Sequence, residues 1–311
     1  MFHNRRHFIK QSIKTGGAVL ASSMVPHWLQ AADNTEHITI LHTNDVHSHL
    51  EAFPFDGSQY AGMGGVAARA ELIKEIKSNN QHVLLVDAGD MFQGTPYFNM
   101  FKGEPEIKAM NMMGYEATTI GNHDFDGGIE NLANQLKLAN FPFIICNYDF
   151  SHTPMEGKTI PYKIFQKGNL KIGVLGVGIE LQGLVSEELY GNTKYFEPVE
   201  HANATAAMLQ KQGCDLIVCL SHLGDAYYDD KISDEILAKE CYDIDIIIGG
   251  HTHKFFEAPK IYQNKKRNNT IVNQVGWAGL ELGRLDYHVS KNGEKNLLKS
   301  HTVVIRRKTN E

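Results

Sequence analysis

Cysteine and tryptophan are scarce in this chain of 311 residues, which has four cysteines and two tryptophans. The cysteines are Cys146, Cys214, Cys219 and Cys241, and no two of them form a C-x-x-C pair. Two of them, Cys146 and Cys219, lie inside apolar strand-like runs. We therefore expect buried, unpaired thiols, and not a disulfide framework or a cysteine metal site.

The first 32 residues lack aspartate and glutamate altogether. Their basic residues are Arg5, Arg6, Lys10 and Lys14. Residues 4–10 resemble a twin-arginine export signal. The mildly apolar stretch at 16–25 is too short to span a membrane, and small residues near 31–32 suit peptidase cleavage. We expect a signal peptide at 1–32 and a periplasmic or otherwise exported protein; the alternative is a basic, disordered tail.

Positive charge is in short supply in the rest of the chain. Without residues 1–32, lysine plus arginine falls from 30 to 26 against 36 acidic residues, and the net charge changes from −6 to −10. This balance disfavours binding to nucleic-acid polymers and anionic membranes. A small phosphorylated substrate is still compatible, because bound divalent cations dominate the field around them.

Residues 33–311 contain no repeat, low-complexity tract or linker, so we expect one domain there. Apolar residues recur at helical spacing at 66–77, 106–113, 129–138, 202–209 and 232–238. Strand-like runs include 143–146, 170–177, 270–275, 284–289 and 301–305, with a turn at 291–293. The pattern predicts an α/β fold, a four-layer α-β-β-α sandwich with two mixed sheets.

Five short polar clusters each follow a strand-like run. They occupy residues 45–47, 89–90, 121–124, 221–222 and 249–253. Each cluster alone is typical of an exposed turn, but Asp, Asn and His at five strand ends converge only if the strands lie side by side. Asp45 and His47, like His251 and His253, are spaced i, i+2, which on an extended strand end points both side chains the same way. The clusters predict a site for two divalent metals at the carboxyl ends of the strands.

The series of clusters resembles the pattern of the metallophosphoesterase (calcineurin-like) superfamily: D-x-H, G-D, G-N-H-(D/E), H and G-H-x-H. Longer matches at 41–47, 89–94 and 121–126 resemble the catalytic domain of the 5′-nucleotidase family, and the resemblance covers about residues 36–307. It implies a metal-dependent phosphoester hydrolase in which a metal-bridging hydroxide attacks the phosphate. No protein nucleophile is then needed.

The resemblance also implies a role for each site residue. One metal would be held by Asp45, His47 and His253, the other by Asn122, His222 and His251, and Asp90 would bridge the two. His123 would act beside the leaving group, as a general acid or as a cation, and Asp126 would hydrogen-bond it and favour its protonated form. The mixed ligands leave manganese, zinc, iron or a similar metal open. Of the other histidines, His42 is expected in the core or behind the site. His49 lies just past the first cluster and could orient the substrate, but we expect it at the surface.

Members of the 5′-nucleotidase family usually carry a second, C-terminal domain whose aromatic residues stack on the base. Because the sequence ends at Glu311, just after the last strand-like run, we expect no such domain in this chain. We expect a nucleotide or a similar phosphomonoester as substrate, and a separate chain could supply the base-binding domain. One alternative is hydrolysis of cyclic nucleotides, nucleotide sugars or a sulfur ester on the same scaffold. Another is a non-catalytic, metal-filled subunit used for docking.

Overall fold

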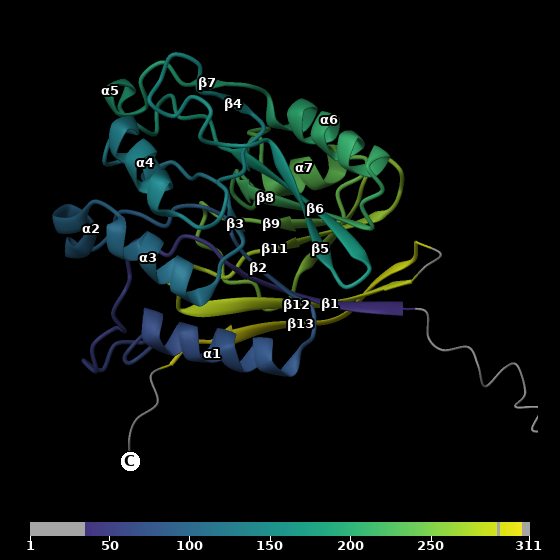
Figure 1. Ribbon diagram of the computed structural model, residues 1–311, viewed down its shortest axis with the longest axis horizontal. Coiled ribbons are helices and arrows are strands. Elements are labelled where there is room, and N and C mark those ends of the chain that lie inside the picture. Colours follow the sequence, from purple (N-terminus) through teal and green to yellow (C-terminus); the bar gives the residue numbers. More distant parts are fainter. Residues whose placement is uncertain (1–34, 291–292, 307–311) are drawn as a thin grey trace, which may run out of the picture. The chain divides into compact units, whose positions relative to one another are not determined.

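The computed structural model describes residues 35–290 and 293–306. The signal peptide expected at 1–32 and two residues of the turn expected at 291–293 lie outside this part. Two mixed sheets form its centre (Figure 1). The five-stranded sheet has the order β13 (Lys295–Val304), β12 (Glu281–Ser290), β1 (Thr35–Thr43), β2 (Val83–Asp87) and β3 (Ala117–Thr118). In this sheet β1 pairs in parallel with β2 and antiparallel with β12.

The six-stranded sheet has the order β10 (Lys260–Gln263), β11 (Asn269–Asn273), β9 (Ile246–Ile248), β8 (Leu216–His222), β6 (Leu170–Gly178) and β5 (Tyr162–Lys167). Strand β8 lies between β6 and β9 and is parallel to both. A separate two-stranded sheet pairs β4 (Tyr148–Asp149) with β7 (Lys194–Tyr195).

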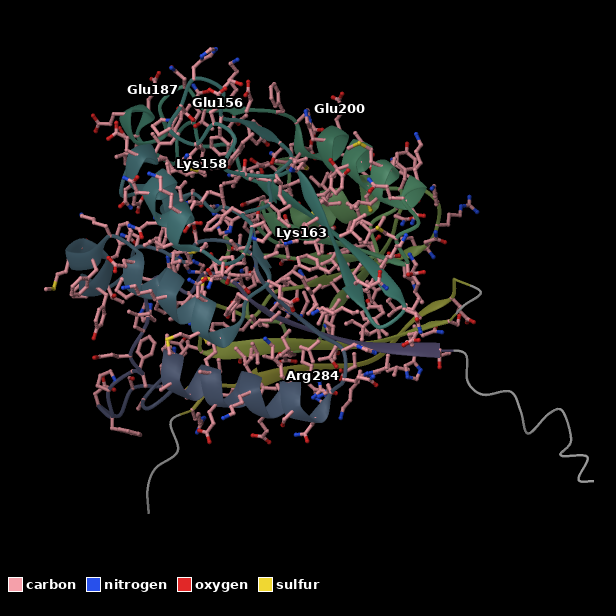
Figure 2. All side chains as sticks on the ribbon, viewed as in Figure 1. Glu156, Lys158, Lys163, Glu187, Glu200 and Arg284 are labelled. Atoms are coloured by element: carbon pink, nitrogen blue, oxygen red, sulfur yellow. The ribbon has the colours of Figure 1, made fainter. Side chains whose placement is uncertain are left out.

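Helices cover the outer faces of the two large sheets (Figure 1). On the five-stranded side they are α1 (Val66–Asn79), α2 (Pro96–Phe101), α3 (Glu104–Met113) and α4 (Ile129–Gln135), with the 3-10 turns η2 (His123–Phe125) and η3 (Leu136–Leu138). The helices that follow β6 are α5 (Glu187–Tyr190), α6 (Pro198–Lys211) and α7 (Asp234–Glu240). Charged side chains such as Glu187 and Glu200 are exposed on these helices (Figure 2).

Alternation along the strands separates the layers, because successive side chains of a strand point to opposite faces. Ile40 of β1 and Val218 of β8 lie in the cluster packed between the two sheets. Their neighbours Leu41 and Ile217 point outward, into the clusters under the helices. The predicted α-β-β-α sandwich is therefore confirmed.

Most predicted elements are confirmed, but the strand predicted at 143–146 is wrong. Its backbone bonds alternately to both sheets: Ile144 N–H donates to Thr118 O and Cys146 N–H donates to Gly176 O, each at 2.8 Å. The segment makes only isolated bridges, Phe143 with Thr118 and Ile144 with Ile160, so it does not form a continuous strand. The four cysteines, all within the described residues, are free, as expected. Within the same residues, no helix is both long and apolar enough to cross a membrane.

Candidate metal centre

The polar clusters meet where strands of both sheets end. Loops after β1, β2 and β3 carry Asp45, Asp90 and Asn122, while β8 ends on His222 and β9 leads to the segment 249–253. The expectation that all five strands lie side by side at the edge of one sheet is wrong, because β8 and β9 belong to the other sheet. These side chains come together because the carboxyl ends of β1, β2, β3, β8 and β9 lie at the same end of the sandwich.

Five of the polar side chains come from residues with left-handed backbone, not from extended strand ends. Their φ angles are 50° for Asp45, 49° for His47, 55° for Asp90, 70° for His251 and 53° for His253. The extended geometry expected from the i, i+2 spacing is therefore wrong. Each such residue costs on the order of 1–3 kcal/mol, so the surrounding structure must hold these loops in place.

Backbone hydrogen bonds join the loop that carries Asp45 to the loop that carries Asp90. The N–H of Asp45 donates to Gly89 O at 3.0 Å, and the N–H of His47 donates to Asp90 O at 3.0 Å. The N–H of Ser48 continues this series by donating to Met91 O at 2.9 Å. Two strained turns thus support each other, as two short strands would.

Asp124 is a structural residue that the sequence reasoning missed. Its buried carboxylate accepts hydrogen bonds from four backbone N–H groups, those of Asp90, Met91, Phe92 and Gly121, at 2.8–3.2 Å. It therefore fixes the Asp90 loop against the loop that carries Asn122. The only signal in the sequence is the acidic residue that closes the Gly-Asn-His-Asp cluster.

Asn44 was also missed, and it orients Asp45. Its Nδ2 donates to Asp45 Oδ2 at 2.6 Å and to Gly276 O at 2.7 Å. Its Oδ1 accepts a hydrogen bond from Val275 N–H at 2.9 Å. The side chain ties the first carboxylate of the site to the segment between β11 and β12.

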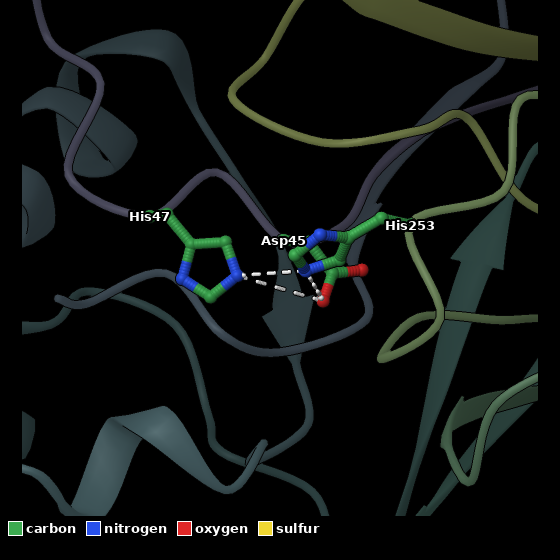
Figure 3. A group of neighbouring side chains, drawn as sticks. All are labelled: Asp45, His47 and His253. Carbon is green, nitrogen blue, oxygen red and sulfur yellow. Dashed lines mark hydrogen bonds and ion pairs between the residues drawn. The ribbon is translucent and has the colours of Figure 1, made fainter. Parts of the chain in front are cut away.

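Asp45, His47 and His253 form the first group of possible metal ligands (Figure 3). The Nε2 atoms of the two histidines lie 3.0 Å apart, and Asp45 Oδ1 lies 3.3 Å from Nε2 of His253 and 3.9 Å from Nε2 of His47. His47 Nδ1 lies 3.2 Å from Phe92 O, which leaves Nε2 for a metal. Burial lowers the pKa of His47, which favours the neutral ring that a metal requires.

Asp90, His222 and His251 form the second group. His222 Nδ1 lies 2.7 Å from Ala88 O, and its buried Nε2 lies 3.0 Å from Asp90 Oδ2. That Nε2 has no well-aligned hydrogen bond to any described residue, as expected for an atom that binds a metal. Asn122 joins this group, because its Oδ1 lies 2.8 Å from His251 Nδ1. Burial lowers the pKa of His251 to about 4.

Asp90 lies between the two groups. Its Oδ2, close to His222 of the second group, is 3.9 Å from His47 Nε2 of the first. Burial disfavours the charged ring of His222, yet Asp90 outweighs this and raises the pKa of His222 to about 10. The buried carboxylates of Asp45 and Asp90 thus favour positive charge in the space between the two groups. The oxygen and imidazole donors around them fit a pair of divalent cations.

His123 and Asp126 form a pair at the edge of this centre. His123 N–H donates to Asp90 Oδ1 at 2.8 Å, and His123 Nδ1 lies 2.8 Å from Asp126 Oδ2. This hydrogen bond raises the pKa of His123. The ring lines a cavity of about 360 Å³ together with His47 and His253 of the first group. A protonatable group therefore faces the same space as the metal ligands.

His42 and His49 are not among the proposed metal ligands, and they lie in different surroundings. His42 is fully buried beside Asn273, with 2.8 Å between its Nε2 and Asn273 Nδ2, which confirms the core position expected for it. His49, for which a surface position was expected, is only partly exposed. Its half-buried ring stacks on Phe53 and lines the same cavity as His123.

Residues 38–255 match the family model described as calcineurin-like phosphoesterase. Snake venom 5′-nucleotidase from Gloydius brevicauda is 36% identical over 234 residues, which are 73% of this chain and 39% of that protein. The 5′-nucleotidase of Vibrio cholerae is 32% identical over 303 residues, covering 88% of this chain and 52% of its own length. The crystal structure of a 5′-nucleotidase precursor from Thermus thermophilus matches with a TM-score of 0.79 and 30% identity, over 87% of this chain and 55% of that one. The chain therefore spans about half of the length of these proteins, or less.

We expect the purified protein to bind about two divalent ions per chain. Asp90→Asn should lose both ions because it weakens both groups, whereas Asp45→Asn should retain the ion of the second group. Elemental analysis after dialysis against each candidate metal measures the stoichiometry. Asp126→Asn makes the same chemical change outside the ligand set and should retain both ions. Equal, mild losses in Asp90→Asn and Asp45→Asn would contradict the bridging position of Asp90.

Proposed function

This chain belongs to the calcineurin-like phosphoesterase family, and on that premise we propose that it is an exported, two-metal phosphomonoesterase that acts on nucleotides. Proteins of this family use two divalent metals, and two ligand groups are present here. The observation that carries the proposal is the meeting of both groups at Asp90, next to the His123–Asp126 pair. A docking subunit would need the metal ligands but not a protonatable histidine in the same cavity.

We assign the ligands as the family pattern implies. Asp45, His47 and His253 would hold one ion, Asn122, His222 and His251 would hold the other, and Asp90 would contact both. When bound, the two cations supply Lewis acidity and neutralise the charge of the phosphate. His123 donates a proton to, or places positive charge near, the oxygen of the leaving group. Asp126 fixes His123 Nδ1, which leaves Nε2 for the substrate.

A nucleotide is the favoured substrate because the similar proteins described above are named 5′-nucleotidases. The cavity of about 360 Å³ lies beside the first ligand group and is lined by residues from several loops. Cyclic nucleotides, nucleotide sugars and sulfur esters are the alternatives on the same scaffold. A separate chain that supplies a base-binding domain stays a prediction.

The proposal is tested by substrate turnover. With added manganese or zinc, the protein should release inorganic phosphate from adenosine monophosphate, and a chelator should abolish the release. The same assay with a cyclic nucleotide, a nucleotide sugar and a thiosulfate ester ranks the alternatives. Absence of turnover of every phosphomonoester with every divalent metal would refute a phosphomonoesterase.

His123→Ala should reduce kcat on the order of 10²–10⁴-fold while metal content stays unchanged. The loss should be smaller for p-nitrophenyl phosphate than for adenosine monophosphate, because a good leaving group needs less protonation. His288→Ala is a matched control, since His288 pairs with His37 at the opposite end of β1 from Asp45. A loss of metal from His123→Ala would show that His123 is a ligand instead.

Export through the twin-arginine route is proposed from residues 1–32, which lie outside the described residues. The double change Arg5→Lys and Arg6→Lys keeps the charge but removes the arginine pair. We expect the precursor of this variant to remain in the cytoplasm, measured by fractionation and immunoblotting. Lys10→Arg, which keeps both arginines, serves as the control. Normal export of the double variant would argue for the general secretory route.

A further inference from the structure

One side of the cavity beside the metal centre is formed by aromatic residues, and the proposed reaction does not use them. Trp277 lines this cavity together with His123, and its indole is only partly buried. The segment that carries it is tied to the first metal loop on both sides. Asn44 Nδ2 donates to Gly276 O at 2.7 Å, and Ala278 N–H donates to Asp45 O at 2.7 Å. The indole is therefore held at a fixed place relative to Asp45.

Four rings fix the orientation of Trp277. It lies parallel to the ring of His253, with centroids 5.9 Å apart and planes at 10°. The rings of His49, Phe53 and Tyr60 meet it edge-on at 5.3, 6.1 and 6.3 Å. Such edge contacts are a favoured geometry of aromatic pairs. We call His49, Phe53, Tyr60 and Trp277 the aromatic wall.

A row of rings connects the aromatic wall to His123. The ring of His123 lies 5.3 Å from that of His47, and His47 lies 5.0 Å from His253, which stacks on Trp277. His123 and Trp277 thus border one cavity from different sides of the first ligand group. A leaving group whose oxygen is next to His123 has its organic part within this cavity, where the indole is the large aromatic surface.

We propose that Trp277 is a specificity-determining residue that binds planar leaving groups, a nucleobase or an aryl ring, against the aromatic wall. The inference rests on the proposed function, which places the phosphate at the metal ligands. The metals and His123 would contact the phosphate and its ester oxygen, which all phosphomonoesters share. Of a bound substrate, the indole would contact only the part that lies beyond that oxygen, so it would distinguish one leaving group from another.

The kinetic test compares adenosine monophosphate with ribose 5-phosphate, which has no ring system to stack. Trp277→Leu should raise KM for adenosine monophosphate about 5- to 150-fold, the range of one lost base–aromatic contact. KM for ribose 5-phosphate should change little, and Trp277→Phe should restore much of the difference. Phe165→Leu is the matched control, because Phe165 is also a half-buried aromatic residue. It lies on β5, where it pairs with Ile172, at the edge of the six-stranded sheet that is opposite to β10 and β11. Equal increases for both substrates would overturn the proposal.

Trp277 also packs on His253, a proposed metal ligand. Measuring the metal content of the variant therefore shows whether the indole binds the substrate or only holds His253 in place. Trp277→Leu should bind as many divalent ions as the wild type in the elemental assay. A loss of metal that accompanies equal kinetic losses on both substrates would show that the indole only supports His253, and would overturn the specificity role.

Fluorescence gives a readout that does not depend on turnover. The chain has two tryptophans, and Trp28 lies in the proposed signal peptide, so protein made without residues 1–32 has Trp277 as its sole indole reporter. Adenosine should quench its emission in a saturable way, with and without a chelator, and ribose should not. No quenching by adenosine or by adenosine monophosphate would overturn the inference. Quenching by adenosine without hydrolysis of any phosphomonoester would refute the proposed function and leave the aromatic site standing.

Discussion

The burial of two aspartates in one small volume is the constraint on which the site depends. Asp45 and Asp90 are 0% and 1% exposed, and each has an oxygen within 3.9 Å of Nε2 of His222. Buried like charges are unfavourable unless cations or hydrogen bonds compensate them. The surrounding imidazoles and Asn122 offer nitrogen and oxygen donors that fit such cations. A metal bound there would offset this repulsion, so metal binding and the stability of these loops would be coupled.

Backbone hydrogen bonds hold the loops that carry these two aspartates. The loops after β1 and β2 are held by N–H donors, and the Asp124 carboxylate gathers four such donors from two loops. Gly121 has no side chain where a Cβ would overlap the Asp90 carboxylate. These bonds hold the loops in place and so offset the cost of the left-handed backbone at Asp45, His47 and Asp90.

Prediction from the sequence succeeded where local pattern determines structure. Alternating apolar residues gave the layers of the sandwich, and short polar clusters after strands identified side chains that the structure brings together. Prediction failed where the outcome depends on distant contacts. The run at 143–146 has the composition of a strand, but its hydrogen bonds go to two sheets. The spacing of Asp45 and His47 suggested an extended end, whereas contacts with the Asp90 loop impose left-handed turns.

The aromatic wall shows why specificity is harder to predict than chemistry. A metal ligand set requires particular residue types at fixed spacings, so it leaves a pattern in the sequence. A stacking surface requires only flat rings at a suitable distance, and here the rings come from residues 49–60 and from residue 277, which are far apart in the chain. His49 illustrates the difficulty: it follows the first cluster directly, yet its contact with Trp277 depends on the loop between β11 and β12. The turns that hold Asp45 therefore also place the surface that would select the substrate.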